Sequence, residues 1–193
     1  MRLVKKFERD DRTELVSRIF DKVITQTDCH LPFGCIEFHV RDSDVSIIED
    51  GTAVICVNYN NPLVLEKDQK GIDILLRHEL FRLMFKMSLP RMVEDVIVAR
   101  EMIKRGYGND IFYMYYNYAM KTRVNSAEDY MKVNLPWIIF HGYDKHDSEF
   151  LKALAKKLCK KKFPETKKFV DLLCNLSPKN LSEAVKECEG LVH

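Results

Sequence analysis

Three residues whose side chains could take part in catalysis or binding occur close together in one apolar segment, residues 70–87. They are His78, Glu79 and Arg82. The segment contains no proline, and its one glycine stands near its start, so we predict a helix. At about 100° per residue these three side chains and that of Lys86 fall on one narrow polar stripe. Almost all other positions are apolar, which is typical of a buried helix. Its charged groups must therefore be paired, because an unpaired buried charge is costly.

The run His78-Glu79-Leu80-Phe81-Arg82 resembles the zinc-peptidase helix signature His-Glu-x-x-His, with arginine in place of the second histidine. In that signature two imidazoles one turn apart bind zinc, and the glutamate is the general base for the zinc-bound water. Arginine is no metal ligand, because it stays protonated and offers only donors. The resemblance to zincin-like peptidases of the gluzincin type therefore implies a degenerate motif. Glu79 would be catalytic only in an active enzyme.

A second helix is expected from Arg91 to Arg105, after a turn that ends at Pro90 and before Gly106. In the zincin-like peptidases that take a downstream glutamate as a ligand, the second helix returns antiparallel and presents this carboxylate. The resemblance implies that Glu94 would hold the metal with His78, if a metal is bound.

Three strands are expected before this helix pair: Cys35–Val40, Val45–Glu49 and Thr52–Asn58, the last two joined by an Asp50-Gly51 hairpin turn. With short strand 2–7 and helix 10–25 before them, they predict an antiparallel meander. The resemblance implies that 53–58 is the edge strand beside the zinc helix. We therefore expect a peptide or protein partner to pair along Ala53–Asn58, near Asn58 and the His78/Arg82 stripe.

Beyond residue 109 no further strand is expected. Helical patterns cover 111–121, a helix from a Ser126–Asp129 capping box to Pro136, 149–162 capped by Asp147 or Ser148, 164–176 and 181–191. The expected fold is α+β: a zincin-like core of helix, three-strand meander and two-helix hairpin, followed by an all-helical C-terminal half. We divide the chain into residues 1–125, the core with its aromatic helix, and 126–193, a helical bundle packed on it.

Composition places the chain among ordinary soluble proteins, with 46% hydrophobic and 31% charged residues and a net charge of +2. No apolar run reaches the ~18 residues of a membrane span, and the first residues lack a secretory apolar core. Six scattered cysteines without a Cys-x-x-Cys pair favour reduced thiols in a cytoplasmic protein over disulfides in a secreted one.

A lysine-rich stretch remains: nine lysines occur from Lys145 to Lys168, against Asp147, Glu149 and Glu165. Such a run is usually a solvated face. The alternative is a weak, sequence-independent contact with a phosphate polymer or an acidic partner.

We favour a non-catalytic, degenerate zincin-like protein that binds a peptide or protein partner and needs no cofactor. In this interpretation Arg82 forms a salt bridge with Glu79 or Glu94. The alternative is an active metal-dependent peptidase with zinc on an unusual ligand set. A third possibility is polyanion or nucleic-acid binding through the lysine-rich stretch. Spacing links no other histidine to His78; these are His30, His39, His141, His146 and His193.

Overall fold

The computed structural model describes residues 2–8, 10–26, 34–41, 45–85 and 89–192. They form a mixed α and β protein with two compact units, residues 1–87 and 88–193, and each unit is described by itself. The division expected after residue 125 falls inside the second unit. Three residues named above lie outside the described ranges: His30, Lys86 and His193.

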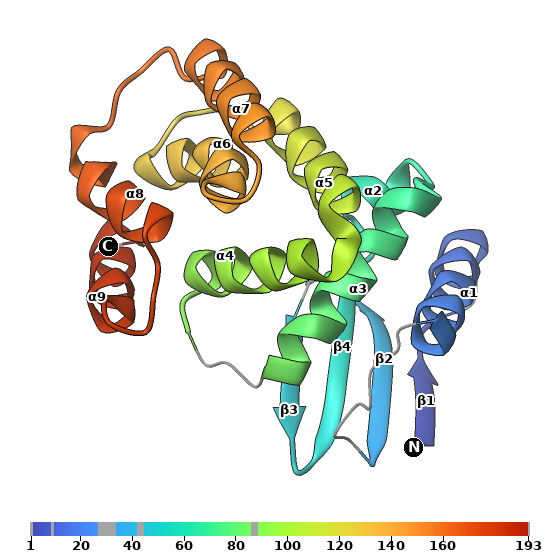
Figure 1. Cartoon of the computed structure of the whole chain (residues 1–193). Coiled ribbons are helices and arrows are strands. Elements are labelled where there is room, and N and C mark those ends of the chain that lie inside the picture. Colours follow the sequence, from blue (N-terminus) through green and yellow to red (C-terminus); the bar gives the residue numbers. More distant parts are fainter. Residues whose placement is uncertain (1, 9, 27–33, 42–44, 86–88, 193) are drawn as a thin grey trace. The chain divides into compact units, whose positions relative to one another are not determined.

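The first unit carries a four-stranded mixed sheet (Figure 1). Its elements are β1 (Arg2–Lys6), α1 (Asp11–Gln26), β2 (Cys35–Arg41), β3 (Val45–Glu49), β4 (Thr52–Asn58), α2 (Pro62–Leu65) and α3 (Gln69–Phe85). The strand order is β1-β2-β4-β3. Strands β1, β2 and β4 are parallel, whereas β3 runs antiparallel to β4 at one edge.

The expected antiparallel meander is therefore wrong, and so is the expectation that Ala53–Asn58 forms an edge. Strand β4 pairs with β2 on one side and β3 on the other, so it is central. The physical reason lies in its side chains: five consecutive residues from Ala53 to Val57 are buried, on both faces of the strand. A strand buried on both faces belongs in the middle of a parallel sheet. The Asp50-Gly51 hairpin itself is confirmed, with positive φ at both residues.

One face of this sheet carries the hydrophobic core of the unit. Ile36 and Phe38 of β2 and Ala53 and Ile55 of β4 point to the face that helices α1 and α3 cover. The helices contribute Leu15, Val16, Ile19, Phe20, Val23, Ile72, Leu76, Leu80 and Leu83 to it. The expected helix after Asp10 is confirmed, because the Asp10 carboxylate accepts hydrogen bonds from the N–H groups at its start.

The described residues of the second unit form helices and the turns between them, with no strand. Its elements are α4 (Arg91–Met102), a π-helical turn η1 (Ile103–Tyr107), α5 (Gly108–Lys121), α6 (Ala127–Phe140), α7 (Lys145–Leu158), a 3₁₀ turn η2 (Pro164–Thr166), α8 (Lys167–Cys174) and α9 (Leu181–Val192). The Ser126–Asp129 capping box is confirmed. Within the described ranges, no helix combines the length and the apolar character that crossing a membrane requires.

Of the helix boundaries that differ from expectation, two have a clear local cause. Pro136 does not end its helix but lies inside α6, because buried residues from Leu135 to Phe140 hold the chain helical despite a cost of about 3 kcal/mol. Helix α7 begins at Lys145 rather than Glu149. Its N-cap is Asp144, whose carboxylate accepts a hydrogen bond from the N–H of Asp147.

A buried arginine joins three helices of this unit. Arg100 of α4 is 8% exposed, and its guanidinium donates to the carbonyl oxygens of Ile138 and Ile139 near the end of α6. It also donates to the carbonyl oxygen of Cys174 at the end of α8. Carbonyl groups at helix ends lack partners in their own helix, so one cation satisfies two helix C-termini.

Candidate functional site

The candidate site lies on α3, whose start is fixed by tight local packing. The Asp68 carboxylate accepts a hydrogen bond from the N–H of Gly71 at 3.0 Å. A Cβ at Gly71 would lie 2.6 Å from the Asp68 carboxylate and 2.7 Å from the Leu63 side chain, so the close approach requires glycine. The core residues of α3 then recur every three or four positions from Ile72.

The three side chains of the expected stripe occur together on this helix. His78 and Glu79 are each 2% exposed. Arg82 Nη1 lies 3.2 Å from Glu79 Oε2, so the expected ion pair is present within α3. His78 Nδ1 lies 3.9 Å from the other carboxylate oxygen of Glu79. The carboxylate therefore lies between an imidazole and a guanidinium.

This arrangement determines what the group can do chemically. In the zinc-peptidase signature, the glutamate acts as general base by accepting a proton from the zinc-bound water. Here the Glu79 carboxylate is bonded to the permanent cation of Arg82 instead. The ion pair neutralises a buried negative charge without a metal.

A second polar pair on α3 joins it to α1. Arg77 Nε lies 2.5 Å from Asp73 Oδ1, an i,i+4 ion pair within the helix. Arg77 Nη2 also donates to the side-chain oxygen of Gln26 at 3.0 Å, at the end of α1. This pair stabilises the unit on the side of α3 away from His78.

Glu94, the other candidate metal ligand, belongs to the second unit, whereas His78 belongs to the first. It is 1% exposed in the first turn of α4. Its Oε1 accepts a hydrogen bond from the N–H of Leu89 at 3.0 Å. Glu94 thus stabilises the start of its own helix, where the dipole favours a negative charge. Its place in a metal site with His78 stays a prediction.

Asn58, expected near a bound peptide, shapes the turn that follows β4. Its side-chain oxygen accepts a hydrogen bond from the N–H of Asn60 at 2.8 Å. Asn61 then caps α2 through the N–H of Leu63. These Asx turns lead the chain from the central strand toward α3.

The feature that the sequence analysis missed is the edge strand β3. It pairs with β4 on one side, and no described strand pairs with its other side. Ile47 and Ile48, on opposite faces of the strand, are 39% and 38% exposed. In the sequence, the available signal for this strand was the pair Ile47-Ile48 shortly before the hairpin turn. An exposed edge strand usually carries polar residues at such positions, so this pair marks β3 as unusual.

His39 is the other described histidine of the first unit, and it contacts a different set of residues. His39 of β2 is 3% exposed, and its Nε2 lies 3.0 Å from Glu37 Oε2, which also binds Lys6 Nζ at 2.8 Å. The hydrogen bond from Lys6, followed by that from His39, lowers the pKa of Glu37. These three residues line the sheet face opposite the hydrophobic core.

Among the described residues, one group brings three possible metal ligands within 4.8 Å of one another: Asp144, His146 and Asp147. It lies at the exposed start of α7, where the Asp144 carboxylate is already the N-cap. Capping accounts for this cluster, so we assign no metal to it.

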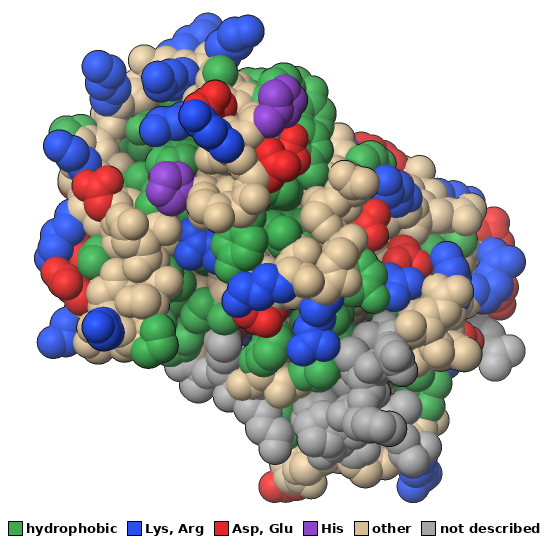
Figure 2. Space-filling model, in the orientation of Figure 1, with side chains coloured by type: hydrophobic (Ala, Val, Ile, Leu, Met, Phe, Trp, Pro, Cys, Tyr) green, Lys and Arg blue, Asp and Glu red, His purple; other side chains and the backbone are tan. Residues whose placement is uncertain are grey.

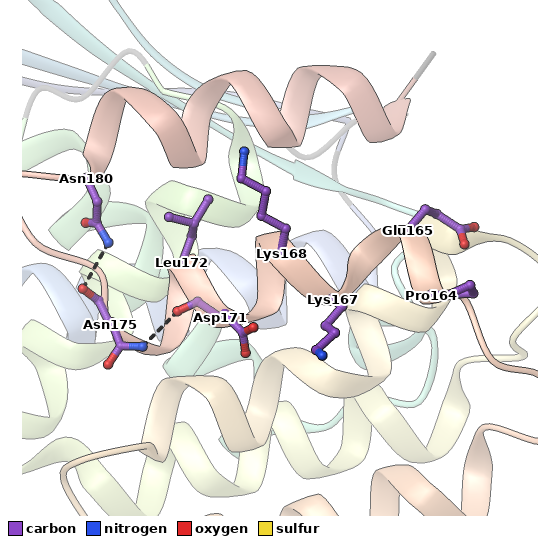
Figure 3. Close-up of a pocket in the computed structure, with 8 residues that line it drawn as sticks. All are labelled: Pro164, Glu165, Lys167, Lys168, Asp171, Leu172, Asn175 and Asn180. Atoms are coloured by element: carbon purple, nitrogen blue, oxygen red, sulfur yellow. Dashed lines mark hydrogen bonds between the residues drawn. The ribbon is translucent and has the colours of Figure 1, made fainter.

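A shallow hollow of about 500 Å³ lies along α8 in the second unit (Figure 3). Its lining comprises Pro164, Glu165, Lys167, Lys168, Asp171, Leu172, Asn175 and Asn180. Figure 3 shows Lys168 and Lys167 pointing in opposite directions. Lys168 binds Glu183 and Glu187 of α9 at 3.0 and 2.5 Å. Lys168 is therefore already paired, and Glu165 and Asp171 add negative charge to the lining. The hollow has no single sign of charge that would select a charged ligand.

No protein family, curated protein or solved structure matches this chain.

Proposed function

We propose that this chain is a non-catalytic protein of zincin-like design that binds an extended protein or peptide segment through its sheet. The observation that carries the proposal is the ion pair between Arg82 Nη1 and Glu79 Oε2, 3.2 Å apart on a buried helix. Arg82 stands at the position of the second zinc-binding histidine in the signature. The pairing supports a helix that keeps its carboxylate for stability, with no role in hydrolysis.

Binding is assigned to β3 because it differs from the other edge of the sheet. Strand β1 carries Arg2, Lys5 and Lys6, and charged side chains protect an edge against pairing with another chain. Strand β3 contains no cation and no proline, and its one charged residue, Glu49, stands at its end beside the hairpin turn. Such a weakly protected edge offers backbone N–H and C=O groups that an added strand can use, and this mode requires no metal.

The sheet supplies a matched control for this proposal. Leu3 of β1 and Ile48 of β3 lie in one row across the sheet, through Ile36 and Ala53. Leu3 is 37% exposed and Ile48 38% exposed. The same substitution at these two positions therefore places one charge on each edge, at equal exposure and on the same face.

The experiment selects binding peptides from a random library against the purified chain and measures their affinity for two variants. Ile48→Lys is expected to weaken binding at least about tenfold. The added peptide strand would cover the new lysine, and burying its charge costs more than about 1.4 kcal/mol. Leu3→Lys should leave affinity within about twofold. Bound peptide should also slow amide exchange in Val45–Glu49.

Three results would overturn the proposal: failure to select any peptide, equal affinities of both variants, or unchanged amide exchange in β3. Melting temperatures of the two variants guard against a folding defect. Leu3 and Ile48 lie in the same row of the sheet, at its two edges. A loss of binding that came only from lower stability of the sheet should therefore appear in both variants.

A further inference from the structure

The stretch from Lys152 to Lys168 concentrates positive charge on the second unit. It contains eight exposed lysines and Glu165 as its single acid: Lys152, Lys156, Lys157, Lys160, Lys161, Lys162, Lys167 and Lys168. The whole chain has a net charge of only +2, so the rest of the chain is net negative. Figure 2 shows Lys and Arg side chains gathered over α7 and the coil after it. The charge is thus local and not a property of the whole surface.

Among the residues that the structure describes, most of these lysines have no acidic partner. Lys168 binds two glutamates of α9, Lys152 Nζ lies 4.6 Å from the Trp137 ring centre, and Lys161 Nζ lies 5.0 Å from that of Phe163. For the others, no carboxylate among the described residues lies within ion-pair distance: Lys156, Lys157, Lys160, Lys162 and Lys167. A solvated helix face normally interleaves acids, as α9 does with Glu183, Lys186 and Glu187.

We infer that this lysine surface binds the phosphodiester backbone of a nucleic-acid duplex without reading its sequence. Lysine ammonium groups bind phosphates as point charges, whereas specific base contacts most often use the planar fork of arginine. The stretch contains no arginine. The inference rests on the second unit alone, so it is independent of the function proposed for β3.

The side chains between the lysines argue against two other polyanion partners. A basic membrane-binding surface also inserts apolar side chains, and a single-strand-binding surface stacks bases on aromatic rings. None of the large hydrophobic side chains that are exposed in the described residues falls between Lys152 and Lys168. Phe163 is 9% exposed. Charge without apolar or aromatic contact fits the outside of a duplex.

The experiment titrates the whole chain against a labelled DNA duplex of about 20 base pairs and mixed sequence, between about 50 and about 200 mM salt. Five unpaired lysines that release about 0.9 counterion each predict a log–log slope near −4.5, or an affinity loss of about 500-fold across this range. An RNA duplex of the same sequence shows which backbone is preferred.

Two triple variants test the location. Lys156→Gln, Lys160→Gln and Lys162→Gln together should reduce the slope by about 2.7. Lys22→Gln, Lys67→Gln and Lys179→Gln remove the same charge from exposed positions elsewhere, and should leave the slope unchanged. Melting temperatures check that both variants fold.

Four outcomes would overturn the inference: no binding to either duplex at low salt, binding that resists about 200 mM salt, equal losses in the two triple variants, or binding only to vesicles with about 30% phosphatidylserine. The last outcome would make the surface a membrane contact.

Discussion

Arg82 and Glu79 form an ion pair within one turn of α3, with Nη1 and Oε2 3.2 Å apart. The Glu79 side chain is 3% exposed and that of Arg82 19%. On a solvated helix an i,i+3 pair is worth about 0.2–0.5 kcal/mol. The burial of Glu79 changes this, because loss of the arginine removes a cation from a carboxylate in the interior.

We predict that Arg82→Ala lowers the free energy of unfolding of the first unit by about 3 kcal/mol, the cost of breaking a buried pair. Chemical denaturation followed by circular dichroism measures it. Arg18→Ala removes an exposed arginine from α1 and should change stability by less than about 0.5 kcal/mol. Adding Glu79→Gln to Arg82→Ala should restore part of the loss. An unchanged denaturation midpoint in Arg82→Ala would contradict the role of the pair.

Purified wild-type protein should contain less than about a tenth of an equivalent of zinc, measured by elemental analysis. Even catalytic zinc sites have about three protein ligands, and α3 offers His78 with a permanent cation one turn away. Arg82→His is the matched variant, since it restores two imidazoles at i and i+4 and should raise zinc uptake. One equivalent in the wild type, lost in His78→Ala, would establish the metallopeptidase alternative instead.

Local signals predicted much of the fold. The Asp50-Gly51 turn, the Asp10 cap and the Ser126–Asp129 capping box each involve residues at most a few positions apart, so the sequence contains their whole cause. The partner of β4 is not local. A tight turn fixes β3 beside β4, but the pairing of β2 with β4 depends on which strand can be buried on both faces.

The run from Ala53 to Val57 did carry this signal, because it is apolar at five consecutive positions and does not alternate. The resemblance to zincin-like peptidases led to the opposite prediction, that this run is an edge strand. The edge position of β3 was therefore missed. The same distinction holds for the candidate site. Helical spacing places His78, Glu79 and Arg82 together, whereas Glu94 lies beyond a connection and in another unit.

Arg100 was invisible to sequence analysis, since its partners are backbone carbonyls about 40 and 74 positions away along the chain. Arg100→Met keeps an unbranched apolar stem but removes the guanidinium that donates to three carbonyl oxygens. We predict a loss of about 3 kcal/mol in the stability of the second unit, since hydrogen bonds to charged groups are worth roughly 1.5–3 kcal/mol.

Arg123→Met is the control for this variant, because Arg123 is exposed in the same unit. Urea denaturation of the two variants should separate them by more than about 2 kcal/mol. Similar midpoints would mean that water replaces the guanidinium without loss.

The thiol of Cys174, at the end of α8, should be unusually slow to react. Burial raises its pKa to about 11 and outweighs the opposite influence of Arg100. At pH 9 about 1% of this thiol is ionised, against half of a thiol with the ordinary value of 9.0, so alkylation should be about fiftyfold slower than that of such a thiol. Mass spectrometry of the labelled chain measures the rate at this residue.

The same shift predicts how stability depends on pH. A thiol whose pKa is higher in the folded state favours folding below its unfolded pKa, near 9, and this contribution is lost as pH rises through about 11. Cys174→Ser does not titrate in this range, so the stability of the variant should fall less between pH 9 and 11. Alkylation of Cys174 at the rate of a free thiol at pH 9, or equal pH profiles of the two proteins, would show that the α8 end opens to solvent.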